Sequence, residues 1–294
     1  MSKAKIGFIC SMLIAGSLGL FVRGIPLSSA QIALTRGILG SLFIFGVALL
    51  SGQRFSVARI RQNFVPLLLS GIALGFNWML LFQAYQHTTI ATATICYYFA
   101  PVLILFLSPF LLKEKLNKVK VCCMLAAMAG MICVAGNGGA GSGNFVGVLY
   151  GLGAAVVYAS IVLLNKRFQD ISGVESAFVQ LLVSALTMFP YVLFTDGFYL
   201  EKISGTAILL LIIVGVVHTG VMYLLYFSCL QKLESQTAAV FSYIDPVSAI
   251  VFAAVFLQEG MKPLQIAGGV LVLGATLLNE VYAARQKGRE AVVQ

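Results

Sequence analysis

Apolar residues occupy most of this chain in runs of about 20, separated by short polar segments. A run of that length crosses the hydrocarbon core of a bilayer as a helix. We count ten such runs, at residues 5–22, 28–51, 64–85, 90–112, 119–136, 145–164, 174–195, 206–228, 236–258 and 263–283. None shows the strict alternation of apolar and polar positions that is typical of a membrane β-barrel. The pattern therefore predicts an all-α membrane protein with ten transmembrane helices.

The second half of the chain is similar to the first. At an offset of 145 residues, the identical positions include Phe82 with Phe227, Tyr98 with Tyr243, Pro101 with Pro246 and Glu114 with Glu259. Upstream the offset is 144, and it matches Gly7 with Gly151, Ala15 with Ala159 and Ser28 with Ser172. A duplicated, apolar chain is typical of secondary transporters, whose two halves enclose one central site.

The boundaries of the two repeats follow from a stretch of glycines and small polar residues. This stretch, residues 137–144, predicts a flexible linker. We expect a first five-helix repeat at 1–136, a second at 145–284 and a basic cytoplasmic tail at 285–294. Because five is an odd number, the second repeat begins on the opposite side of the membrane. The two repeats are therefore predicted to have inverted topology.

Composition and charge narrow the class further. Hydrophobic residues make up 60% of the 294 residues and charged residues only 10%, against about 25% charged residues in a soluble domain. The net charge of +9 comes mainly from Lys and Arg on the same side as the N-terminus, which the positive-inside rule places in the cytoplasm. We expect a multi-pass protein of a bacterial-type cytoplasmic (inner) membrane with both termini cytoplasmic. The chain has no basic patch with interleaved aromatics, which is the pattern that would indicate a nucleic-acid partner.

Pairs of small residues four positions apart let membrane helices approach closely. They can join helices of one chain or two copies of it, and we favour packing within one chain, hence a monomer. The pairs are Gly71 with Gly75, Gly147 with Gly151, and Ala126 with Gly130.

Ten helices from an inverted five-helix duplication, with the equal spacings Pro101–Glu114 and Pro246–Glu259, resemble the drug/metabolite transporter superfamily, and the EamA-type branch fits best. The resemblance covers nearly the whole chain. It implies an inner-membrane carrier, usually an exporter, for small metabolites such as amino acids or toxic organic compounds. It also implies that Glu114 and Glu259 help to gate the two mouths of a central cavity.

Paired helix breaks in the two halves indicate where a transporter binds its substrate. Pro101 and Pro246 form such a pair. Each lacks an N–H and should therefore kink its helix and free the carbonyl four residues earlier, on Tyr97 and Ser242. Such kinks also occur in membrane helices without a function, healed by neighbouring side chains.

Two charges are predicted to lie within the membrane. Asp245 stands beside Pro246, and an embedded carboxylate usually faces a cavity. It can serve as a proton or cation site, anchor a substrate amine, or bond structurally to neighbouring hydroxyls. Arg36 can hold a substrate carboxylate, extend to the outer surface or pair with Asp245. Together the two charges match a zwitterion.

Polar and aromatic residues in the same predicted spans complete the candidate site. His218 can carry a proton or simply form neutral hydrogen bonds. The other candidates can line an aromatic cavity or pack the core; with Ser242 they are Asn77, Trp78, Tyr97, Tyr98, Tyr223 and Tyr243. Trp78 can alternatively anchor its helix at the membrane interface. Glu175 and His87 lie near span ends, where we expect them to be solvated.

The sequence thus predicts a secondary active transporter that exports a small metabolite, with an amino acid as the leading class, by alternating access and with protons as a possible coupling ion. One alternative is an organic-cation or drug exporter, and another is a passive facilitator or channel. No catalytic, phosphate-binding or metal-binding motif is present. We therefore expect no enzyme activity and no cofactor.

Overall fold

The structure is a computed structural model, and it describes residues 3–52, 55–111, 118–136, 142–196, 204–230, 232–233 and 241–293. All regular secondary structure in these ranges is helical. The predicted gating residue Glu114 and most of the predicted linker lie outside the described residues.

The helices follow one another along the chain with short connections. The first half contains α1 (Lys3–Arg23), α2 (Ser29–Leu50), α3 (Val57–Gln62), α4 (Phe64–His87), α5 (Ile90–Tyr97), α6 (Ala100–Leu111) and α7 (Lys118–Gly136). The second contains α8 (Ser142–Asn165), α9 (Gly173–Thr195), α10 (Gly205–Gly215), the π-helix η2 (Val216–Val221), α11 (Met222–Leu230), α13 (Ile244–Phe256) and α14 (Pro263–Val293).

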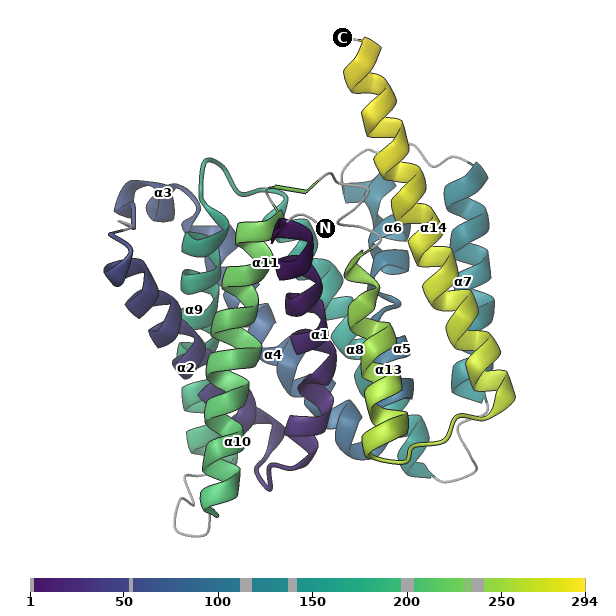
Figure 1. Cartoon of the computed structure of the whole chain (residues 1–294), viewed down its shortest axis with the longest axis horizontal. Coiled ribbons are helices and arrows are strands. Elements are labelled where there is room, and N and C mark those ends of the chain that lie inside the picture. The colour runs from purple at the N-terminus through teal and green to yellow at the C-terminus, as the bar shows by residue number, and fades with distance from the viewer. Residues whose placement is uncertain are drawn as a thin grey trace.

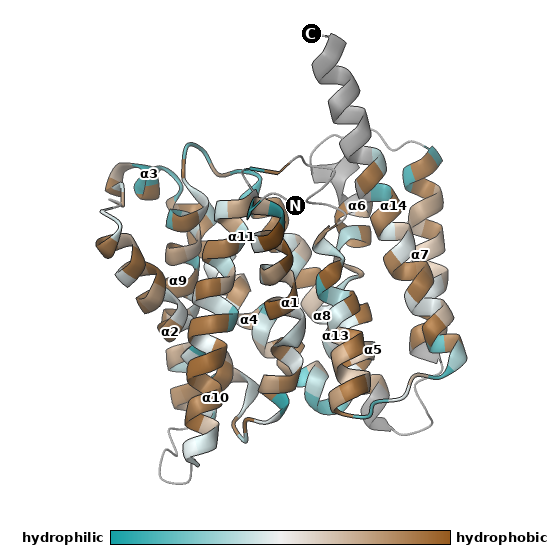
Figure 2. Ribbon diagram, in the orientation of Figure 1, coloured by the Kyte–Doolittle hydropathy of each residue, from teal (hydrophilic) through white to brown (hydrophobic). Residues whose placement is uncertain are grey.

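Six helical stretches are long and apolar enough to cross a membrane: α1, α2, α4, α8, α9 and the continuous run from α10 through η2 into α11. Large apolar side chains cover the outside of the bundle, among them Leu42, Leu49, Phe189 and Phe194 (Figure 2). Such a surface suits lipid and not water. The predicted spans 90–112, 119–136, 236–258 and 263–283 are helical over most of their described residues but are not among the six. The count of ten spans therefore stays a prediction.

The helices of the two halves interlock. α4 packs against α8 and α9, α2 against α9, and α1 against α11 and α13, while α7 pairs with α14 at one side of the bundle (Figure 1). Both ends of the chain lie on the same side of the molecule as α3, and the last turns of α14 extend beyond the bundle there. We call this side the terminal side and the other the far side.

The helices α2 and α9 begin with the same device at equivalent positions of the two halves. Ser28 and Gln31 form a capping box at the start of α2, and Ser172 and Glu175 form one at the start of α9. In each box the serine hydroxyl accepts a backbone N–H while the second side chain accepts the N–H of the serine. This local chemistry explains why both helices begin where the apolar runs begin.

The helices that carry the two prolines are interrupted more strongly than by a kink. A turn at Tyr98 and Phe99 separates α5 from α6, and a turn at Tyr243 precedes α13. Pro101 and Pro246 stand in the first turns of α6 and α13. A proline is well accommodated there, because the N–H groups of a first helical turn have no partner within the helix. The two prolines therefore follow turns between helices and do not stand at kinks within continuous helices, as the sequence had led us to expect.

The small-residue pairs pack helices of this chain against one another. Gly71 and Gly75 face α9, and Gly147 and Gly151 face Thr88 and Cys96 respectively. On α7, Gly130 lies so close to α14 that an added Cβ would be 2.6 Å from the carbonyl oxygen of Gly268. The expectation that these faces pack within one chain is confirmed at these positions.

Alanine at Gly268 should destabilise the protein, because its Cβ would lie 2.6 Å from the carbonyl oxygen of Gly130 and 2.9 Å from Cβ of Cys133. Overpacking of this kind costs about 1–3 kcal/mol. Gly274 on the same helix has no neighbouring atom within 4 Å of an added Cβ, so Gly274→Ala should be neutral or slightly stabilising. Thermal unfolding in detergent would measure both variants. Equal effects would contradict the close approach of α7 and α14.

Candidate substrate site

Polar and charged side chains gather inside the apolar bundle. They come from α1, α2, α4, η2 and the two helix breaks. Arg36, Asn77, His218 and Thr219 are each at most 4% exposed, and Asp245 is partly buried. Ionisable groups inside a membrane bundle usually mark a substrate or ion pathway.

Arg36 is held by three neighbours. Its Nε donates to Oγ1 of Thr219 at 2.7 Å, and Nη2 donates to the carbonyl oxygen of His218 at 3.3 Å. The guanidinium also lies over the ring of Trp78, 4.1 Å from its centroid, in a cation–π contact. Arg36 does not extend to the outer surface. Trp78 is buried beneath it, so the interfacial anchor considered for this tryptophan is wrong.

The π-helix η2 presents the partners of Arg36. The Thr219 hydroxyl donates to the carbonyl of Val214 five residues earlier, at 3.0 Å. The preceding residue, His218, packs against α1. Its Nε2 lies 2.9 Å from Oγ of Ser17, and its ring centroid lies 4.6 Å from that of Phe21. Single π-turns occur frequently at functional sites, and here the turn joins the two halves around Arg36.

Asp245, at the helix break of the second half, faces Tyr98 at the helix break of the first half. The hydroxyl of Tyr98 donates to its Oδ2 at 2.5 Å. The carboxylate and the guanidinium of Arg36 also attract each other across the site. A charge-assisted hydrogen bond of this length is among the stronger polar contacts in proteins. The bond brings the two breaks of the duplicated chain together.

Tyr98, which bonds to this carboxylate, belongs to a group of neighbouring tyrosine rings. The ring of Tyr98 lies 5.9 Å from that of Tyr97 and 6.5 Å from that of Tyr243, and Tyr158 lies 5.2 Å from Tyr97. The hydroxyl of Tyr97 donates to Oδ1 of Asn77 at 3.4 Å. The faces of such rings attract cations and stack on flat molecules.

Not every candidate residue joins this group to the same degree. Tyr223 stacks on Phe227 at 6.0 Å and lies within electrostatic range of Arg36. Ser242 lies next to the turn at Tyr243. Asn77 donates to the carbonyl of Ala154 at 2.7 Å, which ties α4 to α8.

Three contributors were missed in the sequence: Ser17, Tyr158 and Thr219. Each stands in an apolar run that also holds other polar residues, and none has an identical residue at the equivalent position of the other half. The repeat therefore offered no signal for them.

A polar cluster lies on the far side of the bundle, at the ends of α1 and α4 and the start of α5. Arg23, the last residue of α1, forms an ion pair with Glu259. Arg23 also donates through Nη2 to the carbonyls of Tyr85 at 3.0 Å and Thr88 at 2.7 Å, and Oε2 of Glu259 accepts the N–H of Ile90 at 2.8 Å. The cation therefore lies at the C-terminus of α4 and the carboxylate at the N-terminus of α5, as the helix dipoles favour. We call this group the far-side latch.

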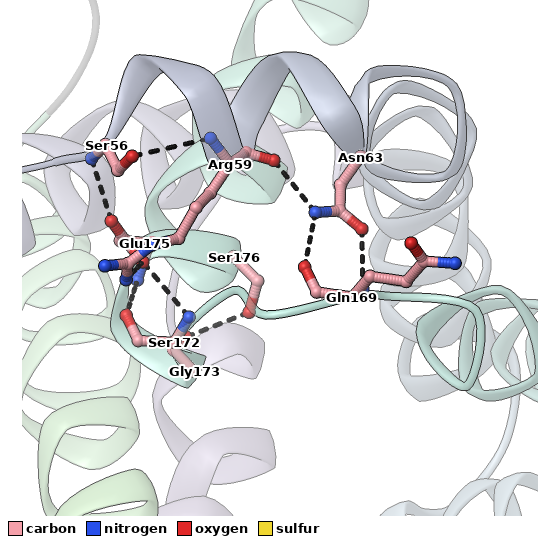
Figure 3. Close-up of polar contacts among 8 residues, drawn as sticks. All are labelled: Ser56, Arg59, Asn63, Gln169, Ser172, Gly173, Glu175 and Ser176. Carbon is pink, nitrogen blue, oxygen red and sulfur yellow. Dashed lines mark hydrogen bonds and ion pairs between the residues drawn. The ribbon is translucent and has the colours of Figure 1, made fainter.

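A second cluster joins the two halves on the terminal side (Figure 3). Glu175 accepts the N–H of Ser56 at 2.9 Å and pairs with Arg59 at 3.4 Å. Nearby, Asn63 donates to the carbonyl of Gln169 and accepts its N–H, both at 2.8 Å. Glu175 is only 6% exposed, so the expectation that it is solvated is wrong. His87 is exposed, as expected.

An apolar helical bundle with charged and aromatic side chains at its centre is typical of a membrane transporter. The chain belongs to the EamA-like transporter family, whose model matches residues 2–136 and again 145–280. The resemblance noted in the sequence is confirmed, and the protein is a multi-pass membrane transporter.

Named relatives agree with this assignment, and a solved structure shares the fold. An uncharacterized transporter of Bacillus subtilis, YxxF, is 30% identical over 99% of this chain and 93% of its own length. The riboflavin transporter ImpX of Fusobacterium nucleatum is 26% identical over 64% of this chain and 65% of its own. A crystal structure 18% identical in sequence shares the fold, with a TM-score of 0.66 over 97% of this chain and 99% of that one.

Thr219→Val should lower the unfolding temperature by several degrees, because it leaves the Nε–H of a buried guanidinium without its acceptor. An unsatisfied buried donor costs about 1–3 kcal/mol, and more when the group is charged. Thr276→Val is the matched control, since Thr276 is also buried and bonds to a carbonyl of its own helix, Val272, at 2.9 Å. Thermal unfolding in detergent should show the larger loss for Thr219→Val. Equal losses would mean that Arg36 does not depend on η2.

Proposed function

We propose that this protein is a secondary active transporter that exports a small amine-bearing metabolite, with an amino acid as the leading class, by alternating access. One observation supports the proposal above the others. The carboxylate of Asp245 lies at a helix break inside the bundle, among tyrosine rings, with the charge of Arg36 across from it. An ammonium group would find there a counter-charge and aromatic faces.

The amino-acid reading uses both charges. Asp245 would bind the ammonium group, and Arg36 would bind the carboxylate. Arg36 bonds to η2 through Nε and Nη2, so Nη1 is the atom through which we expect it to reach a substrate. A zwitterion would then leave the net charge of the site unchanged, which lowers the cost of moving it through lipid.

Two other substrate classes have support of their own. The firm binding of Arg36 by η2 and Trp78 favours an organic cation, because such a substrate needs only Asp245 and the rings. The tyrosine rings, together with the relative named as a riboflavin transporter, favour a flat aromatic molecule that stacks on them. A passive channel is the alternative of another class, and it would show no trans-stimulation by substrate on the opposite side.

The location in the cell follows from charge. We infer a cytoplasmic membrane in which the terminal side, where α3 with Arg59 and Arg61 and both chain ends lie, faces the cytoplasm. Asp245 is the group through which we expect protons to couple to transport. The far-side latch with Glu259 would gate the outer mouth. Glu114, its equivalent in the first half, would act at the inner mouth.

Thermal unfolding in detergent against amino acids, organic amines and riboflavin should identify the ligand class. A ligand that binds only the folded protein adds about 2.7 kcal/mol of stability at one hundred times its dissociation constant. We expect amino acids to stabilise the wild type, and Asp245→Asn and Arg36→Gln to lose the response. Asp245→Asn in liposomes should also lose any dependence of transport on an imposed pH gradient.

The same panel separates the alternatives. If only cations stabilise the protein and Arg36→Gln responds normally, the organic-cation exporter replaces the amino-acid reading. If riboflavin stabilises the wild type and Asp245→Asn equally, a stacking site for flat aromatics replaces both. If every amine stabilises Asp245→Asn as well as the wild type, the proposed role of Asp245 is wrong.

The gate can be tested by labelling in intact cells. Ile90 is 1% exposed, and its N–H binds Glu259. In a cysteine-free background, Ile90→Cys should react slowly with a membrane-impermeant maleimide. Adding Glu259→Gln should raise the rate about fivefold, because the ion pair with Arg23 is lost. Gln258→Ala is the control, since Gln258 is exposed and bonds only to the neighbouring carbonyl of Val255. Equal rates in the two variants would argue against a gate at Glu259.

A further inference from the structure

The bond between Tyr98 and Asp245 connects the two interrupted helices. Tyr98 caps the C-terminus of α5, immediately before the turn to α6. Asp245 stands in the first turn of α13, immediately after the turn at Tyr243. Each partner therefore comes from a different half of the chain, and each adjoins residues outside regular helix. A movement of one half against the other would change this distance before it disturbs the packed helices.

Two oxygens of Asp245, one of the carboxylate and one of the backbone, accept hydrogen bonds from hydroxyl groups. Oδ2 accepts the Tyr98 hydroxyl at 2.5 Å, while the backbone carbonyl of the same residue accepts the hydroxyl of Ser248 at 2.9 Å. Arg36 bonds to Thr219 and to the carbonyl of His218 instead. The neutral Tyr98 hydroxyl thus takes a position on Asp245 that an ammonium N–H would also occupy.

A substrate ammonium would bind this oxygen more strongly than a phenol does, because both of its partners would then be charged. A hydroxyl can also accept a hydrogen bond. Once displaced, the Tyr98 oxygen can therefore accept an N–H from the same ammonium group, which offsets part of the bond that it gives up.

We propose that Tyr98 is a positioning residue that occupies the amine subsite of Asp245 in the empty transporter and yields it to the substrate. Binding then exchanges a direct bond between the two helix breaks for one that passes through the substrate. Occupancy of the site is in this way linked to the freedom of the two halves to move. The inference rests on the proposed binding of an amine by Asp245.

Tyr98→Phe removes the hydroxyl and keeps the ring. In the empty protein we expect a lower unfolding temperature, since the bond to Asp245 is lost. Binding of benzylamine and of phenylalanine, measured by calorimetry on the purified protein, should nevertheless tighten about three- to tenfold, because the amine no longer displaces a hydroxyl. The expected opposite signs set this role apart from a purely structural one, which would weaken both stability and binding. The maximal rate at which Tyr98→Phe exchanges substrate across the membrane of liposomes should fall.

Tyr191→Phe is the matched control, since Tyr191 lies on α9 outside the candidate site, is 36% exposed and has its ring 6.1 Å from that of Phe76. It should leave the affinity for both amines within about twofold of the wild type, within the usual effect of a small surface change. Weaker binding by Tyr98→Phe would overturn the proposal, because Tyr98 would then be a direct ligand. Equal affinities of Tyr98→Phe and Tyr191→Phe would overturn it as well.

The failure of this proposal can be told from the failure of the proposed function. If Asp245→Asn abolishes amine binding but Tyr98→Phe behaves as Tyr191→Phe does, only the role of Tyr98 is wrong. If neither amine binds the wild type, or Asp245→Asn binds as well as the wild type does, the amine site itself is wrong and the role of Tyr98 falls with it.

Discussion

The burial of Arg36 is the constraint on which the rest of the central structure depends. A guanidinium in an apolar bundle is costly unless its N–H groups find acceptors and its face finds an electron-rich surface. The acceptors are the Thr219 hydroxyl and the backbone carbonyl of His218 on η2, and the electron-rich surface is the ring of Trp78 on α4. The π-turn, the buried tryptophan and the meeting of the two halves can all be understood as consequences of accommodating one charge.

The breaks in the two proline-containing helices have a complementary role. They place Tyr98 and Asp245 outside or at the edge of regular helix, where side chains can change partner without unwinding a packed segment. The clusters at the two ends of the bundle are of another kind. At the far-side latch, Arg23 and Glu259 satisfy the ends of α4 and α5 as well as each other, so that separating them costs several bonds at once. The central contacts can thus change partner more easily than the clusters at the two ends of the bundle can separate. A transporter needs such a difference if its halves are to rock about a central site.

The extent of prediction from sequence differs between the fold and the site. The apolar runs placed most helix ends within a few residues, although α14 continues past its run to Val293, and Ser28 and Ser172 mark the starts of α2 and α9. The break at Tyr98 was expected only as a kink, because a proline indicates an interruption without saying how many residues leave the helix. Glu175 was expected in water, since a residue near the end of a span is usually solvated. It is buried because α3, a helix of six residues, brings Arg59 and the N–H of Ser56 to it.

The sequence by itself determined the solvent, the helices and the family, because each depends on local properties: the length of apolar runs, caps next to them, and a duplication visible at a fixed offset. It also singled out Asp245 and Arg36, since a charge in an apolar run is conspicuous wherever the run folds. Only the tertiary structure decided their partners. Thr219 lies 183 positions from Arg36, and Asp245 lies 147 from Tyr98. No pattern along the chain records which faces of helices so distant in sequence come together, because that choice is made by the packing of all the helices at once.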